Sequence, residues 1–177
     1  MIVEEKTLDS ELIYEGAILN LRRDKVTIKD GRTSHREIIE HSGGVVVAAI
    51  TPDGKIPLVR QYRKAAEKAI LEIPAGKLEK DEDPKQAALR KLREETGYRA
   101  KTIDHITSFY SSIGYSDEIL HLYIARDLEP GDTDFDDNEA IDIYEYTLDD
   151  LINMVLDGKI EDAKSIIAIF MLNSINS

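Results

Sequence analysis

The feature that most restricts the fold is a strand-like segment followed by a helix with clear start and stop signals. The apolar run AILEIPAG, residues 69–76, predicts a strand that stops at Pro74-Ala75-Gly76, and the hydrophobic period then changes from two residues to about 3.6. Asp83 can cap a helix, Pro84 suits its first position, and Gly97 can end it. The sequence therefore predicts a strand, a loop and a helix over residues 84–96 that packs on a sheet through an apolar stripe.

The rest of the chain reads mainly as strands, with two helices near its end. Residues 18–39 contain two short strand-like runs around Asp30-Gly31, the strongest hairpin signal in the sequence. Residues 43–63 predict two core strands joined by a turn at Pro52 to Gly54. Further strands are expected within residues 101–112, 118–128 and 140–148, and helices over residues 148–156 and 162–173. Together these elements predict an α/β fold.

The composition indicates a folded protein rather than a disordered acidic chain, because 42% of its residues are hydrophobic and 33% are charged. A length of 177 residues suits one compact domain with at most a small appendage. The net charge of −12 disfavours binding to nucleic acid and to anionic membranes. Cysteine is absent, the N-terminus is acidic, and no apolar run reaches the roughly 18 residues of a membrane span. We therefore expect a soluble protein of the cytoplasm.

Charged side chains on the predicted helix are the first candidates for chemistry. Lys91, Glu94 and Glu95 share one helical face, because separations of three and four residues bring side chains together after one turn. Carboxylates placed in this way can hold Mg²⁺ or Mn²⁺ and present the ion to a phosphate. The alternative is a solvated acidic turn that pairs with Arg90, Lys91 and Arg93. The two glutamates alone favour this alternative, because charged helix faces are common.

The spacing of residues between Gly76 and Tyr98 changes this interpretation. Five residues separate Gly76 from Glu82, and seven more precede Arg90. The residues that follow are Leu92, Glu94, Glu95, Gly97 and Tyr98. This pattern closely resembles the Nudix box, G-x5-E-x7-R-E-U-x-E-E-x-G-U, in which U is a bulky apolar residue. The one mismatch is Lys91, which stands where the box has a glutamate.

The resemblance extends over nearly the whole chain. The segments REIIEH, VRQYR, LEIPAGKLE and FYSSIGYSDEI are similar to those of Nudix hydrolases of the ADP-ribose pyrophosphatase group. The resemblance implies an α/β/α sandwich around a mixed sheet, preceded by an antiparallel sheet that takes part in a domain-exchanged homodimer. Residues 1–42 would form that sheet and residues 43–177 the Nudix domain. It further implies that Mg²⁺ or Mn²⁺ lets water attack a diphosphate, which splits ADP-ribose into AMP and ribose 5-phosphate.

The resemblance also assigns roles to residues of the box. The backbone carbonyl of Ala75 and the carboxylates of Glu94 and Glu95 match metal-binding positions. Glu82 and Arg90 match residues that brace the site, and Glu82 is a further candidate ligand. Negative charge gathers on the diphosphate oxygens in the transition state, so cations dominate catalysis of this kind.

The resemblance implies substrate contacts outside the box. Arg36 and Arg63 match arginines that the group supplies to the substrate, and the geometry of arginine suits bidentate phosphate contacts. Either could instead form a surface salt bridge. Tyr14, Ile18 and Tyr115 are candidates for stacking on adenine, although tyrosines are as often part of the core or the surface.

In this group the general base comes from a loop beyond the box. The segment DFDDNEAID supplies candidates, of which Glu139 is the first choice, with Asp137 and Glu118 behind it. The alternative for this segment is an acidic surface turn.

Two departures from the family pattern affect activity and substrate. An ammonium offers hydrogen-bond donors and no acceptor, so Lys91 cannot coordinate a metal ion, and it can pair with Glu95 four residues away. We therefore expect weakened metal binding. Ile113, sixteen residues after Gly97, stands where the group typically carries proline, which loosens the substrate assignment.

Three hypotheses follow. The first is a hydrolase that tolerates Lys91 by using Glu94, Glu95 and the Ala75 carbonyl, with Glu79 or Glu82, for the metal ion. The second is a catalytically impaired Nudix module that binds a nucleotide-like ligand. The third is that Lys91 is an engineered substitution in an active enzyme. The other site residues are retained, which favours an enzyme or one recently altered.

Overall fold

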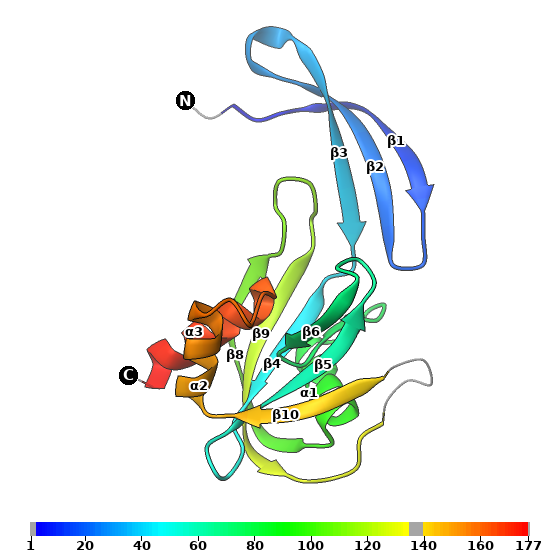
Figure 1. The fold of residues 1–177 in the computed structure, drawn as a ribbon. Helices are drawn as coiled ribbons and strands as arrows, with labels where there is room; N and C mark the ends of the chain where they lie inside the picture. The colour runs from blue at the N-terminus through cyan, green and yellow to red at the C-terminus, as the bar shows by residue number, and fades with distance from the viewer. Residues whose placement is uncertain (1–2, 135–139, 177) are drawn as a thin grey trace. The chain divides into compact units, whose positions relative to one another are not determined.

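The computed structural model describes residues 3–134 and 140–176 and divides the chain into two compact units. The first unit comprises Met1–Gly43 and Tyr110–Ile119, and the second comprises Gly44–Phe109 and Leu120–Ser177 (Figure 1). None of the helices in the described residues is both long and apolar enough to cross a membrane. Glu139 and Asp137, two of the candidates for the general base, lie outside the described residues.

The first unit contains a three-stranded antiparallel sheet in the order β1-β2-β3. Its strands are β1 (Thr7–Glu15), β2 (Leu19–Thr27) and β3 (Thr33–His41). The hairpin predicted at Asp30-Gly31 is confirmed: both residues have positive φ, 70° and 74°, and β2 pairs with β3 on either side of them. The strand β1 was not predicted. All nine of its residues are exposed, so it lacks the buried face that produces an alternating pattern.

The loop at residues 110–119 belongs to this unit because it is hydrogen-bonded to the end of β3. The Ile39 N–H donates to the Tyr115 carbonyl at 2.7 Å, and the Asp117 N–H donates to the Ile39 carbonyl at 3.1 Å. The Asp117 carboxylate also accepts from the His41 N–H at 2.9 Å, and Glu118 lies 3.2 Å from Nδ1 of the His41 ring. Residues far apart in the sequence therefore form one small structural unit.

The second unit has two sheets and three helices. The sheets are a four-stranded one in the order β7-β4-β9-β8, in which β4 and β9 are parallel, and a three-stranded one in the order β10-β5-β6. The strands are β4 (Gly44–Ala49), β5 (Ile56–Arg63), β6 (Lys68–Glu72), β7 (Ala75–Lys77), β8 (Arg99–Tyr110), β9 (Ile119–Glu129) and β10 (Ile141–Tyr146). The helices are α1 (Pro84–Thr96), α2 (Leu148–Leu156) and α3 (Ala163–Asn176).

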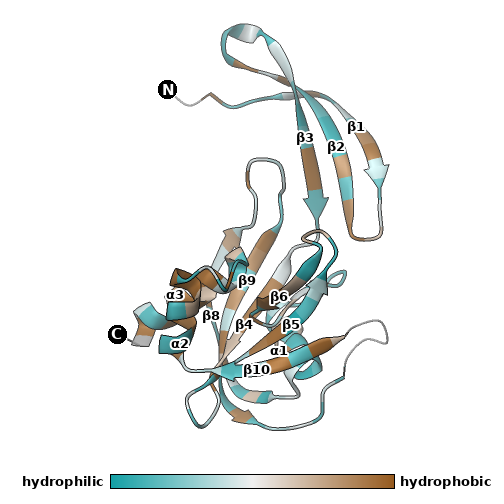
Figure 2. Cartoon of the chain, in the orientation of Figure 1, coloured by the Kyte–Doolittle hydropathy of each residue, from teal (hydrophilic) through white to brown (hydrophobic). Residues whose placement is uncertain are grey.

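The central strand β4 is buried on both faces, which is typical of a strand between two helical layers. Val46 and Ala48 belong to the core that contains residues of α2 and α3, including Leu151 and Leu172. Val45, Val47 and Ala49 belong to a second core with Ala88 and Leu92 of α1. Figure 1 shows α1 on one side of this sheet and α2 and α3 on the other, and Figure 2 shows how hydrophobic α3 is. The predicted α/β/α sandwich around a mixed sheet is confirmed.

The strand predicted to stop at Pro74-Ala75-Gly76 is confirmed as β6, whereas the short strand β7 that follows Pro74 was not predicted. β6 pairs with β5 in one sheet, whereas β7 pairs with β4 in the other. Pro74 separates them, since it has no N–H to continue a ladder, and its carbonyl accepts from the Val47 N–H at 2.8 Å. The chain therefore changes sheets immediately before the residues of the box.

The helix α1 has the limits that the sequence predicts. The Asp83 carboxylate accepts from the Gln86 N–H at 3.1 Å, and Gly97 ends the helix with a φ of 76°. The helix α2 also matches its prediction, whereas α3 extends further than the predicted residue 173. Asp162 stands immediately before α3 and accepts from the Ser165 N–H at 3.0 Å, so it caps this helix.

Candidate active site

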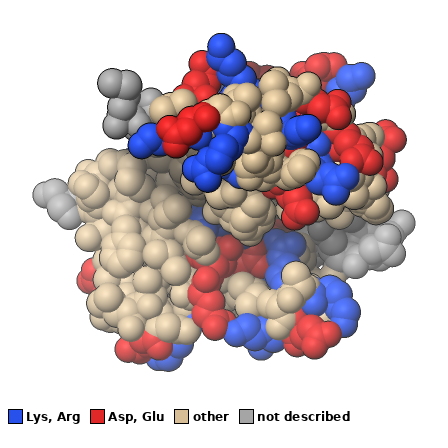
Figure 3. All heavy atoms as spheres, turned by 90° about the horizontal axis from the view of Figure 1, so that it is seen from above, with Lys and Arg blue, Asp and Glu red and all other residues tan. Residues whose placement is uncertain are grey.

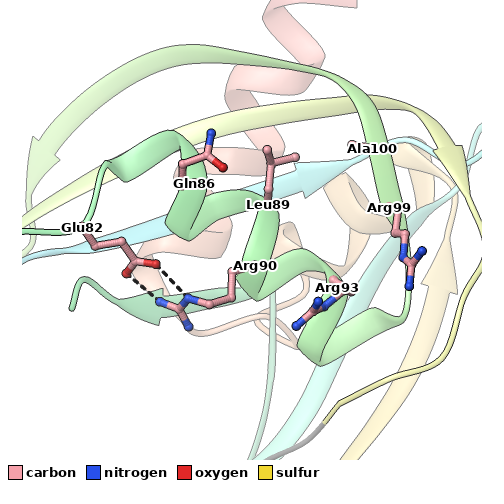
Figure 4. A pocket seen from close by; sticks show the side chains of 7 residues that line it. All are labelled: Glu82, Gln86, Leu89, Arg90, Arg93, Arg99 and Ala100. Carbon is pink, nitrogen blue, oxygen red and sulfur yellow. Dashed lines mark hydrogen bonds and ion pairs between the residues drawn. The ribbon is translucent and has the colours of Figure 1, made fainter.

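The candidate active site is formed by β7, the loop that follows it and one face of α1. Arg90 on α1 makes two hydrogen bonds to Glu82 of the loop, Nε to Oε1 at 2.8 Å and Nη2 to Oε2 at 2.7 Å (Figure 4). Its Nη1 lies 3.2 Å from Oε2 of Glu94. The hydrogen bond from Arg90 lowers the pKa of the Glu82 carboxyl below its usual range. The structure therefore places Arg90 between two carboxylates of the predicted site, where it fixes the loop against the helix.

Glu95 joins the helix to β7. Its side chain is 3% exposed, and Oε2 accepts a hydrogen bond from the Ala75 N–H at 3.2 Å. A carboxylate this deeply buried needs hydrogen-bond donors, because burial without them destabilises the charged form. The structure thus brings together Ala75 and Glu95, which the resemblance places in one metal site.

Lys91 lies inside this cluster rather than in solvent. Its ammonium Nζ is 2.9 Å from Oε2 of Glu94, and its side chain is 14% exposed. The methylene groups lie against Gly76, where an added Cβ would overlap Cγ, Cδ and Cε of Lys91. Burial acts to lower the pKa of Lys91, but its hydrogen bond to Glu94 and the charges of Glu94 and Glu95 outweigh burial and raise it. Lys91 is therefore a charged residue held in a defined place.

The carboxylates of this site, as they are arranged, do not fit a divalent ion. No group of three or more His, Asp or Glu side chains that could hold a metal ion occurs within residues 3–134 and 140–176. The cause is visible in the contacts, because Arg90 binds both oxygens of Glu82 and Lys91 binds one oxygen of Glu94. Cations of the chain therefore occupy oxygens that a metal ion would need.

The hollow beside α1 has a volume of about 540 Å³ and contains two arginines that the sequence analysis did not assign to a site. Figure 4 shows Arg93 and Arg99 near the C-terminal end of the helix, along from the Glu82–Arg90 pair. The Arg93 guanidinium is 3.5 Å from the carboxylate of Asp134. The full lining is Glu82, Gln86, Leu89, Arg90, Arg93, Arg99 and Ala100. The sequence signal for this hollow is the recurrence of arginine between residues 90 and 99.

Most charged side chains elsewhere stand at the surface. Acidic and basic groups are interspersed over the face shown in Figure 3, and exposed pairs such as Lys55 with Asp53 are frequent. Exposed ion pairs of this kind contribute little to stability. The buried carboxylate of Glu72, which has two cationic partners, is different in kind.

Arg63, a predicted substrate residue, is bound to a buried carboxylate. Its Nε and Nη2 donate to the two oxygens of Glu72 at 2.6 and 2.9 Å, and Glu72 is 2% exposed. Lys164 of α3 is the second partner of Glu72. Burial acts to raise the pKa of the Glu72 carboxyl, but the two cations outweigh it and lower the pKa. Glu72 and Lys164 carry no sequence signal for this pairing, because they lie 92 residues apart.

The other predicted substrate residues belong to the first unit. Arg36 forms an ion pair with Glu5, with Nε 2.8 Å from Oε2. Tyr14, Ile18 and Tyr115 have exposed side chains, as does Ile113 at the position where the group carries proline. Their roles stay predictions, and so does the role of Glu118.

Comparisons with known proteins agree with this geometry. The NUDIX domain family matches residues 40–168, and the nucleoside diphosphate sugar hydrolase N-terminal domain family matches residues 5–39. A "Methanol dehydrogenase activator" of Bacillus methanolicus is 46% identical over 170 residues, which cover 95% of this chain and 92% of the relative. An "ADP-ribose pyrophosphatase" of Bacillus subtilis is 44% identical over 169 residues, which cover 94% of this chain and 91% of the relative.

A solved structure described as an ADP compounds hydrolase has the same fold. It superposes with a TM-score of 0.87 at 20% identity, over 98% of this chain and 95% of that one. The match of the family to most of the chain, the close relatives and the box residues on β7 and α1 lead to one conclusion. This chain belongs to the Nudix hydrolase family.

Proposed function

We propose that this protein hydrolyses the diphosphate bond of ADP-ribose, or of a related nucleoside diphosphate sugar, to give AMP and ribose 5-phosphate. The observation that carries this proposal is the retained arrangement of the box, in which Arg90 braces Glu82 and Glu94 while Glu95 is held by Ala75. Relatives from Bacillus subtilis and Mycobacterium tuberculosis, 44% and 34% identical, are named ADP-ribose pyrophosphatase. A more distant one, 28% identical, is named GDP-mannose pyrophosphatase.

In this proposal the residues of the chain hold the diphosphate and balance its charge. Negative charge builds on the phosphate oxygens as the bond breaks, and fixed cations stabilise it more than mobile ones can. Arg63 and Arg36 would contact the substrate phosphates, and Tyr14, Ile18 and Tyr115 the adenosine. Glu139 would act as the general base towards water, with Asp137 and Glu118 as the alternatives.

Nudix hydrolases generally use divalent metal ions, and we propose Mg²⁺ or Mn²⁺ here. Such an ion, when bound, supplies a Lewis acid for the phosphate oxygens. The groups that would hold it are the carbonyl of Ala75 and the carboxylates of Glu95, Glu94 and Glu82, once Arg90 and Lys91 release the oxygens that they bind in this structure. Because Arg90 and Lys91 occupy several of these oxygens, binding should be weaker than in a variant with glutamate at position 91.

We further propose a cytoplasmic homodimer that acts on a small nucleotide, without nucleic acid or membrane as a partner. The contact would be made by the sheet within residues 1–42, outside the Nudix domain at residues 43–177. The support is that this part of the chain exposes several apolar side chains. Exposed apolar patches commonly mark surfaces that bind a protein partner. The exposed apolar side chains are Leu8, Leu12, Ile13, Tyr14 and Ile18.

A second candidate is a catalytically impaired module that binds a nucleotide-like ligand. Two observations favour it: Lys91 lies within the cluster of carboxylates, and a 46% identical relative is named as an activator of another enzyme. The two candidates differ in turnover, which a direct assay measures.

The test is release of AMP from ADP-ribose with Mg²⁺ or Mn²⁺, followed by chromatography, for the protein and for Lys91→Glu and Glu95→Gln. We expect slow turnover that Lys91→Glu increases and Glu95→Gln abolishes. Turnover that Glu95→Gln abolishes would exclude the binding module. No turnover by the protein, combined with turnover by Lys91→Glu, would exclude the active enzyme. Lys85→Glu, an exposed change of equal charge on α1, is the matched control.

A further inference from the structure

We propose that the Lys91 ammonium takes the place of a divalent cation, so that this site binds a diphosphate group without any metal ion. The proposal rests on the proposed function only in taking a diphosphate as the ligand. The residues of the box lie in the expected place, but within residues 3–134 and 140–176 the carboxylates do not converge on an ion.

The fold holds the Lys91 side chain in one position. Lys91 and Glu95 are four residues apart on α1, so a glutamate at 91 would face the same space as Glu95. Lys91 directs its ammonium to Glu94 at 2.9 Å, and its methylene groups are held against Gly76 of β7. This packing leaves the side chain 14% exposed. The positive charge is therefore fixed among the carboxylates, rather than distributed over the many conformations of a surface lysine.

Lys91 also changes the net charge of the cluster. Glu82, Glu94 and Glu95 contribute three negative charges, and Arg90 and Lys91 contribute two positive ones, so the cluster carries a net charge of −1. With glutamate at 91 the same cluster would carry −3. A cluster at −3 repels a diphosphate unless added cations reverse the field, whereas one at −1 with a central ammonium repels it much less. Compared with glutamate, lysine at position 91 therefore weakens both the attraction of the cluster for a metal ion and its repulsion of a phosphate.

The Lys91 ammonium can donate hydrogen bonds to a phosphate. An ammonium carries three N–H donors and no acceptor, and Glu94 takes one of the donors of Lys91. Lysine binds phosphate oxygens as a compact point charge, and such charge-assisted hydrogen bonds are among the stronger ones in proteins. Arg90 contacts Glu82 and Glu94, so it offsets part of the negative charge of these two carboxylates within the cluster. The ligand class that suits this site is a diphosphate in its metal-free form.

The experiment is isothermal titration of inorganic pyrophosphate into the full chain in EDTA and, separately, in excess Mg²⁺. The protein should bind pyrophosphate in EDTA. Lys91→Gln should weaken this binding by about tenfold to a hundredfold, because it removes a charged hydrogen bond. Lys91→Glu should not bind pyrophosphate in EDTA and should bind it once Mg²⁺ is present. Lys85→Gln, an exposed lysine of the same helix, should bind as the unchanged protein does.

Two results would overturn the proposal. One is that pyrophosphate binds to the protein only with Mg²⁺, and the other is that Lys91→Gln binds in EDTA as tightly as the protein. Titration with Mn²⁺ followed by electron paramagnetic resonance gives an independent measurement, in which the protein should bind Mn²⁺ at least tenfold more weakly than Lys91→Glu. Equal Mn²⁺ affinities would also overturn it. Circular dichroism of each variant verifies that it is folded.

The outcome is separable from that of the proposed function. Binding of pyrophosphate that depends on Lys91, without hydrolysis of ADP-ribose, would support the role of Lys91 and contradict the hydrolase. Hydrolysis of ADP-ribose together with strictly metal-dependent pyrophosphate binding would do the reverse.

Discussion

Replacing Arg63 with methionine should destabilise the second unit, because Arg63 donates two hydrogen bonds to the buried carboxylate of Glu72. These bonds are 2.6 and 2.9 Å long, and the acceptor is 2% exposed. A hydrogen bond to a charged group contributes about 1.5–3 kcal/mol. The Arg63 side chain is 44% exposed, so the lower end applies, and Lys164 still pairs with Glu72 in the variant. We therefore expect a loss of about 1.5–2 kcal/mol in the free energy of unfolding.

The same contacts predict how stability depends on pH. The partners of Glu72 hold its pKa in the folded state below the value it has in the unfolded chain. Glu72 therefore stabilises the fold above the unfolded pKa, and this contribution is lost as the pH falls through the folded pKa. Without Arg63 the folded pKa of Glu72 rises towards its usual range. The variant should accordingly lose stability at a higher pH than the protein does on acidification.

The assay is urea unfolding followed by far-ultraviolet circular dichroism, at neutral pH and at successively lower pH. In thermal unfolding, a loss of about 1.5–2 kcal/mol corresponds to a fall of about 3–8 °C in the melting temperature of a chain of this size. Arg60→Met is the control, since Arg60 is an exposed arginine of the same strand. An unchanged urea midpoint would refute this reasoning, whereas the KM for ADP-ribose separately tests the substrate role proposed for Arg63.

Three further changes have definite expectations. Ser165→Ala removes the acceptor, at 2.8 Å, of the buried Ile73 N–H, so the free energy of unfolding should fall by about 1–3 kcal/mol; an unchanged urea midpoint would contradict this. Asp83→Ala removes the cap of α1 and should destabilise by about 1 kcal/mol in the same assay, whereas Asp83→Asn should retain most of it. Tyr98 donates to Glu145 at 2.7 Å, which raises the pKa of Tyr98 to about 12. Tyr98→Phe should therefore remove a late step from the ultraviolet titration of the tyrosines, and loss of an early step would contradict the assignment. Because the folded pKa is raised, the stability that this hydroxyl contributes is present below pH 10 and lost as the pH rises through about 12.

The helix that carries the site was predictable because its determinants are local. Asp83, Pro84 and Gly97 act within a turn of the helix ends, and the spacing of Arg90 to Glu95 determines which side chains share a face. The strands were less predictable. β1 has no buried face to produce an alternating pattern, and the boundary between β6 and β7 depends on which sheet each joins.

The sequence by itself determined the family, the limits of α1 and the order of charged residues along it, since these follow from neighbours in the chain. The tertiary structure alone decided the partner of each charge. Only the packing of α1 on β7 places Lys91 against Gly76, and only the return of α3 brings Lys164 to Glu72 beside Arg63. A side chain is paired by whatever the fold brings within about 3 Å of it, and for residues 92 positions apart the spacing along the chain does not specify that distance.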